Sequence, residues 1–189
     1  MSKGNSGLFS GTSGATVNST YTSDSTDVES YSERGVDIPK HIMERLSKLQ
    51  HKGDIITGSI GEFTMSDVSV MSKEAGVEFA HITVGNTTYL IRGDVKGTVI
   101  PNELFDKMKR SGGTWDFHSH PHNDDCIPSE GDINALKKLS KYTGQRTSVI
   151  VAPNGKISTF GKDGIISIGT VPNTIDADRQ RALLELFGG

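Results

Sequence analysis

The chain has 189 residues, 23% of them charged, and a formal net charge of −3 at pH 7, which fits one compact domain with a tail and lacks the basic surface of nucleic-acid-binding proteins. No stretch approaches the roughly 18 consecutive apolar residues of a membrane span, so we expect no contact with a membrane. Cys126 is the only cysteine and the N-terminus lacks a secretory pattern, which indicates a reducing, cytoplasmic setting, although a specialised export route would leave no such mark.

The first 35 residues are rich in Ser, Gly and Thr and have neither helical nor strand periodicity. Such a segment has too few apolar side chains to offset the entropy of ordering, so residues 1–35 are predicted to form a disordered tail. Residues 36–189 are predicted to form the folded domain.

The first half of this domain is predicted to contain one helix and several strands. Residues 36–53 are predicted as a helix, because Pro39 suits a first turn and Ile42, Leu46 and Leu49 recur at helical spacing. Residues 54–71 are predicted to form one or two short strands. Residues 76–94 are predicted to form a hairpin with its turn near Gly85 and Asn86.

The second half alternates helices and strands. The predicted elements are a helix at 101–113, a strand at 113–120, a helix at 128–144, three strands at 147–153, 155–161 and 163–171, and a last helix at 176–187. Tight hairpins join the later strands. The predicted fold class is therefore α+β, with a mainly antiparallel or mixed central sheet flanked by helices.

The stretch DFHSHPHNDDCIPSEGD, residues 116–132, holds the candidate functional residues. In a strand, residues two apart point the same way, so His118 and His120 can reach one ion at Zn–N distances of about 2.0–2.1 Å. Ser129 and Asp132 have a simpler explanation as an N-terminal helix cap, and an isolated H-x-H pair can be plain polar surface. The combination favours a metal site, since two imidazoles and one carboxylate leave a fourth position open for water, as in catalytic zinc sites.

These residues resemble the H-x-H-P…S-x-x-D signature of the JAMM (MPN-domain) metalloproteases, which are zinc peptidases and isopeptidases, many of which remove ubiquitin or similar modifiers. The resemblance extends over residues 38–170 in the order of elements and implies an MPN/JAMM-like, cytidine-deaminase-like fold. It implies one Zn²⁺ per chain, held by His118, His120 and Asp132. It also implies that Ser129 donates a hydrogen bond to the oxyanion on the scissile carbonyl. The leader GLFSGTSGA is similar to stretches ahead of toxin domains in bacterial polymorphic toxins, which implies a toxin or effector protease.

The family resemblance further implies a glutamate that takes a proton from the activated water, and three glutamates lie in range. In GVEFAHITV, strand alternation places Glu78 on the apolar face with Ala80 and Ile82, where a carboxylate is costly unless it has a function. Glu62 is expected on the polar face of a strand and remains the alternative. Glu74 is expected in a turn. We therefore predict Glu78 as the general base.

The resemblance implies direct hydrolysis of an amide by metal-activated water, with Glu78 passing the proton to the leaving nitrogen. The implied partners are a protein or peptide substrate, a ubiquitin-like protein among them, or a cognate inhibitor. The alternative function is a non-catalytic binding or scaffold module with the MPN fold.

Two neighbours of the motif have open roles. Asp116 lies two residues before His118, on the same face of a regular strand, and is either an imidazole-orienting group or a plain strand aspartate. Cys126 is expected in the loop, close enough to reach an open zinc position.

Overall fold

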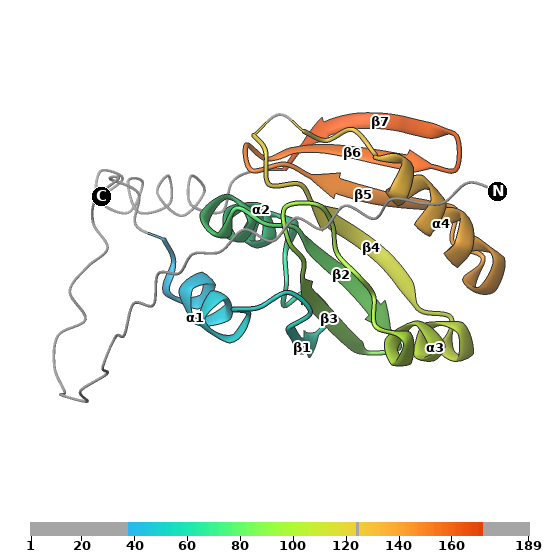
Figure 1. The fold of residues 1–189 in the computed structure, drawn as a ribbon, viewed down its shortest axis with the longest axis horizontal. Helices are drawn as coiled ribbons and strands as arrows, with labels where there is room; N and C mark the ends of the chain where they lie inside the picture. Colours follow the sequence, from blue (N-terminus) through green and yellow to red (C-terminus); the bar gives the residue numbers. More distant parts are fainter. Residues whose placement is uncertain (1–37, 124, 172–189) are drawn as a thin grey trace, which may run out of the picture. The chain divides into compact units, whose positions relative to one another are not determined.

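The structure is a computed structural model that describes residues 38–123 and 125–171 (Figure 1). The predicted tail at residues 1–35 and the predicted last helix at 176–187 lie outside these residues. None of the helices within them has the length and apolar content that a membrane crossing requires.

The described residues form four helices and seven strands. In chain order these are α1 (Lys40–Lys48), β1 (Ile55–Ser59), α2 (Met65–Ala75), β2 (Phe79–Val84), β3 (Thr87–Arg92), α3 (Asn102–Ser111), β4 (Thr114–Ser119), α4 (Glu130–Thr143), β5 (Thr147–Val151), β6 (Lys156–Gly161) and β7 (Gly164–Thr170).

All seven strands belong to one sheet with the order β1-β3-β2-β4-β5-β6-β7. Only β4 and β5 pair in parallel, and α4 makes the crossover between them; the other neighbours pair antiparallel. The fold is therefore α+β with a mixed sheet, as predicted. The predicted hairpin turn at Gly85 is also confirmed, and Gly85 adopts the positive φ of 61° that such a turn requires.

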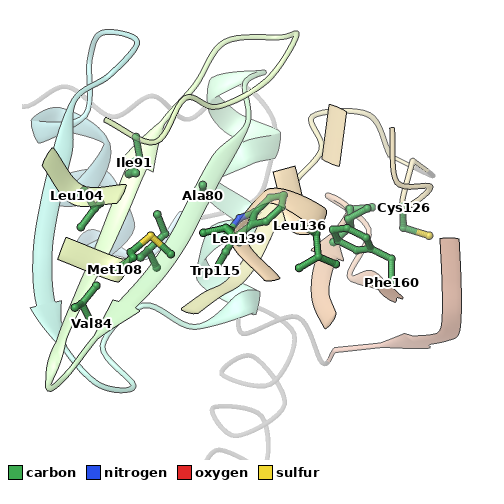
Figure 2. Close-up of a cluster of buried hydrophobic side chains, with 13 residues drawn as sticks. Ala80, Val84, Ile91, Leu104, Met108, Trp115, Cys126, Leu136, Leu139 and Phe160 are labelled. Atoms are coloured by element: carbon green, nitrogen blue, oxygen red, sulfur yellow. The ribbon is translucent and has the colours of Figure 1, made fainter. Parts of the chain in front are cut away.

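Helices cover both faces of the sheet, and each face has its own hydrophobic cluster. On one face, Leu104 and Met108 of α3 and Leu136 and Leu139 of α4 pack on the sheet around Trp115 (Figure 2). The second cluster contains α1, α2 and sheet residues, namely Ile42, Val68, Met71, Phe79, Leu90 and Phe117. Trp115 and Phe117 of β4 are two residues apart yet serve different faces, with Trp115 in the first cluster and Phe117 in the second.

Residues 54–71 were predicted to form one or two strands, but only Ile55–Ser59 is a strand. The prediction was wrong for the second half of this range, where Met65 begins helix α2. Thr64 caps this helix by accepting a hydrogen bond from the Asp67 N–H at 3.1 Å, and Gly76 ends it with a φ of 64°. The predictions for two glutamates fail with it. Glu74 lies in α2 rather than in a turn, and Glu62 lies in the exposed turn before α2 rather than on a strand.

The strand that carries the histidines has a β-bulge. Ala80 pairs with His118, His81 with Phe117 and Ile82 with Trp115, so Asp116 has no partner residue on β2. A bulge reverses the alternation of side chains beyond it. As a result Trp115 and His118 share one face, and their rings stack with centroids 4.7 Å apart.

Candidate metal centre

The two histidines lie at the end of β4, where the sheet holds the backbone in place. His118 is within the strand and pairs with Ile150 of β5, and the His120 N–H donates to the Val151 carbonyl at 3.1 Å, which continues the parallel pairing. Ser72 of α2 donates a hydrogen bond to the His120 carbonyl at 3.3 Å. Both imidazoles are thus carried by backbone that neighbouring elements fix.

The nitrogen and oxygen atoms of three predicted ligands converge. The Nε2 atoms of His118 and His120 are 3.1 Å apart, Asp132 Oδ1 is 3.2 Å from His118 Nε2, and Asp132 Oδ2 is 3.6 Å from His120 Nε2. With bonds of about 2.0–2.1 Å, two ligand atoms of a tetrahedral zinc ion are about 3.3 Å apart. The distances from His118 Nε2 to His120 Nε2 and to Asp132 Oδ1 are close to this value, and the other carboxylate oxygen, Oδ2, faces His120.

Burial and charge favour a cation between these side chains. His118 and His120 are 1% and 5% exposed. Burial lowers the pKa of His118 below its ordinary value despite the nearby Asp132 carboxylate, which leaves a neutral imidazole with a free lone pair. Burial also opposes the charged form of His120, yet the carboxylates of Asp132, Glu78 and Asp125 outweigh it and raise its pKa. The site therefore has an excess of negative charge.

Asp132 is positioned by the capping box of α4. Ser129 is the N-cap; its Oγ accepts from the Asp132 N–H at 3.1 Å, and Asp132 Oδ2 accepts from the Ser129 N–H at 2.7 Å. The Ser129 hydroxyl also donates to the same carboxylate at 2.7 Å. Burial raises the pKa of Asp132, but hydrogen bonds from His118, His120 and Ser129 hold it well below the usual range. Asp132 is thus an anion aimed at the histidines.

Glu78 stands beside this group, immediately before β2. Its carbonyl accepts from Gly93 N–H and its own N–H donates to the Asp94 carbonyl, while the next N–H, of Phe79, donates to Ser119 Oγ at 2.9 Å. One Glu78 carboxylate oxygen and a nitrogen from each of His118 and His120 all lie within 4.8 Å of one another.

The Glu78 side chain has the surroundings of a proton carrier. It is 9% exposed, and burial raises its pKa from 4.5 to about 7, with further raising by Asp132 and Asp94 and an opposing effect of His120. A carboxyl with a pKa near neutrality can both accept and release a proton under ordinary conditions.

The two other candidates for the base, Glu62 and Glu74, lie outside the group that Glu78 forms with the histidines. Glu62 is exposed, and its Oε2 accepts from the Ser59 N–H at 2.9 Å. Glu74 is exposed on α2. Among the described residues, the group of close potential ligand atoms that includes both histidines has Glu78 as its carboxylate, and neither Glu62 nor Glu74 belongs to it.

Asp116 faces away from the centre, contrary to the face predicted for a regular strand. Its carboxylate lies 3.0 Å from His81 Nδ1 and accepts hydrogen bonds from Thr83 and Thr114. His81 in turn stacks on Phe117 of the second cluster. The bulge at Asp116 is the reason, and Asp116 orients His81 rather than a candidate ligand.

Two further residues, Cys126 and Asp125, lie in the loop between β4 and α4. Cys126 is buried and belongs to the first cluster, with its carbonyl accepting from Ser158 Oγ. Asp125, which sequence reasoning did not select, has Oδ1 at 3.4 Å from His120 Nδ1. Its proximity in sequence to His120 was the one available signal.

A pocket of about 350 Å³ opens next to the predicted ligands. Glu78, His118, Ser129 and Asp132 line one part of it, and Trp115 and Leu139 belong to its apolar wall. Trp115 is 5% exposed and belongs to the first hydrophobic cluster, and it also forms part of this pocket.

Comparisons with protein-family models, with curated proteins and with solved structures gave no match for this chain.

Proposed function

We propose that this protein is a zinc-dependent peptidase or isopeptidase of the JAMM (MPN-domain) type, with an MPN/JAMM-like fold. The observation that carries the proposal is the convergence of His118 Nε2, His120 Nε2 and the Asp132 carboxylate at 3.1–3.6 Å, with Glu78 alongside. A simple capped helix after a polar strand end would not require two buried imidazole nitrogens to face each other and a carboxylate.

In this proposal His118, His120 and Asp132 hold the ion. Zinc bound in this way supplies a Lewis acid and lowers the pKa of a coordinated water to about 7. Glu78 accepts the proton of the attacking water and delivers it to the leaving amide nitrogen, a role that fits its buried position beside His118 and His120. No covalent bond between protein and substrate is needed.

Ser129 has two tasks in the proposed mechanism. Its Oγ accepts from the Asp132 N–H and thereby caps α4, and this contact uses only an oxygen lone pair. The hydroxyl proton, which Ser129 donates to the Asp132 carboxylate, can rotate towards the oxyanion of a bound substrate. Capping and oxyanion stabilisation are therefore compatible.

The test of this function is amide hydrolysis by the zinc-loaded protein. Glu78→Gln preserves the size of the side chain but removes the base, so it should retain zinc and lower kcat about 10²–10⁴-fold. The matched control is Glu62→Gln, which alters an exposed glutamate and should leave kcat unchanged. Substrates are a peptide library and a set of ubiquitin-like isopeptide conjugates.

Two results would overturn the proposal. Full activity of Glu78→Gln would show that Glu78 is not the general base. Loss of activity in Glu62→Gln instead would assign this role to Glu62. A zinc-loaded wild type that cleaves no amide in either substrate set would favour the alternative, a non-catalytic binding module with the same fold.

A further inference from the structure

The pocket beside the metal centre has its own chemistry, which the proposed mechanism does not use. Its walls are the segment 96–102 with Phe105 of α3 on one side and α4 on the other, and Ala80 and Trp115 of the sheet contribute to it as well. We infer that this pocket is a substrate subsite for a large apolar or aromatic side chain on a residue flanking the scissile amide. The inference rests on the proposed hydrolase function.

The pocket is large enough to admit a large side chain. Its volume of about 350 Å³ is at the lower end of ligand pockets, which range from about 300 to 1,000 Å³. Ala135 is a small residue on its α4 wall, one turn after Asp132.

The lining is largely apolar. Figure 2 shows Ala80, Trp115 and Leu139 of the first hydrophobic cluster, and all three line the pocket. Ile100 and Phe105 continue this surface, and Val99 remains 65% exposed at the pocket. Burying such exposed apolar area is favourable, by about 25 cal/mol per Å². An apolar side chain is the group that gains most from this environment.

The charges at the pocket differ between its two parts. Glu78 and Asp132 lie in the part next to the histidines, whereas Lys96 and Lys138 are exposed lining residues, and neither ammonium group has a carboxylate partner within residues 38–123 and 125–171. The Lys138 ammonium lies 4.9 Å from the centroid of the Phe105 ring, in the apolar part. A lysine or arginine side chain seated against Phe105 would meet this like charge, so neutral side chains should be preferred there.

The pocket is continuous with the proposed chemistry, because Glu78, His118 and Asp132 line it together with the apolar residues. A side chain seated in it would therefore hold the adjacent amide beside the metal ligands and the base. Remote binding of this kind aligns the reacting bond and contributes to the rate.

Trp115 provides a readout that does not depend on catalysis. It is the only tryptophan of the chain, it lines the pocket and it stacks on His118. The experiment titrates zinc-loaded Glu78→Gln protein, followed by tryptophan fluorescence, with two series of blocked dipeptides, acetyl-Xaa-Gly-amide and acetyl-Gly-Xaa-amide. Xaa is Gly, Ala, Leu, Phe or Lys.

In one of the two series, Leu and Phe should bind at least about tenfold more tightly than Ala, and Lys should bind no better than Gly. The substitution Ala135→Leu fills the pocket and should weaken Leu and Phe binding about tenfold. Its matched control is Asn134→Leu, which adds an apolar side chain at the neighbouring exposed position outside the pocket and should leave these affinities unchanged.

Affinities within about threefold of each other from Gly to Phe in both series, or tightest binding by Lys, would overturn the inference. The dipeptide series on Glu78→Gln protein with Ala135 intact decides this even if the Ala135→Leu variant does not fold. The two proposals can fail separately. Selective binding of Leu and Phe without any hydrolysis by wild-type protein contradicts the hydrolase alone, and hydrolysis without side-chain preference contradicts the subsite alone.

Discussion

Asp132 shows how one side chain can serve the helix and the candidate metal centre together. As the third residue of α4 its carboxylate closes the capping box, and the same group faces His118 and His120. The geometry is compatible with both the capping and the metal explanation of the S-x-x-D pattern. The cap restricts the carboxylate, and such outer contacts of a ligand tune metal affinity.

Ser129→Ala should consequently affect both properties. Loss of the cap should lower the free energy of unfolding by about 1 kcal/mol, and the less restrained Asp132 should bind zinc about 10–100-fold more weakly. Thr64→Ala is the matched control, because Thr64 makes the same cap at α2 and should cost similar stability without changing zinc affinity. Chemical denaturation and calorimetric zinc titration measure the two effects. Equal zinc affinity in Ser129→Ala and wild type would contradict the link.

The residues of the candidate centre differ in how far the sequence could predict them. Glu78 followed from strand alternation, which holds because Ala80, Ile82 and Val84 are buried in one cluster. Asp116 did not follow, because the bulge depends on the register between β2 and β4, and no local pattern encodes that register.

Helix α2 shows why local patterns mislead at the level of elements. In TMSDVSV, polar and apolar residues alternate as in a strand except at the consecutive polar pair Ser66 and Asp67, and Val68 and Met71, three residues apart, are both buried. A capping signal was present at Thr64 and Asp67, with the same spacing as Ser129 and Asp132. Helices α3 and α4 were predicted because their polar and apolar faces separate clearly along ten or more residues.

Helices α1 and α2 are joined by an ion-pair network at Asp67. Arg45 Nη1 donates to Asp67 Oδ2 at 2.8 Å and His41 Nε2 lies 3.1 Å from Oδ1. Burial raises the pKa of Asp67, but Arg45 and His41 together lower it below its ordinary value of 3.8. Because the folded state depresses this pKa, its contribution to stability is present above pH 3.8 and is lost as the pH falls further.

Asp67→Asn should therefore lower the free energy of unfolding by about 1–2 kcal/mol at pH 7, since the substitution leaves the Arg45 charge without its partner. The difference from wild type should shrink on acidification below about pH 4. Asp106→Asn removes an exposed pair with Lys109 and should change the stability much less than Asp67→Asn does. Urea denaturation at several pH values measures both variants. If Asp67→Asn and wild type differed in unfolding free energy by the same amount at low pH, the ion pairs of Asp67 would not be the cause of the difference.

The candidate metal centre connects parts of the molecule that are far apart in sequence. Glu78 precedes β2, the histidines end β4 and Asp132 begins α4. An ion bound only by the folded chain stabilises it by mass action, by about 4 kcal/mol when free zinc is 1,000 times the Kd. Thermal denaturation should accordingly show a higher Tm with zinc than with a chelator. The same Tm in both conditions would mean that the folded protein has no preferential zinc site.

The most direct measurement is the zinc stoichiometry of the purified protein by calorimetric titration and metal analysis. We predict one zinc per chain in the wild type and loss of most of this binding in His118→Ala and in Asp132→Ala, with both variants still folded by circular dichroism. A wild type that binds no zinc, or folded variants that bind as much as the wild type, would contradict the account.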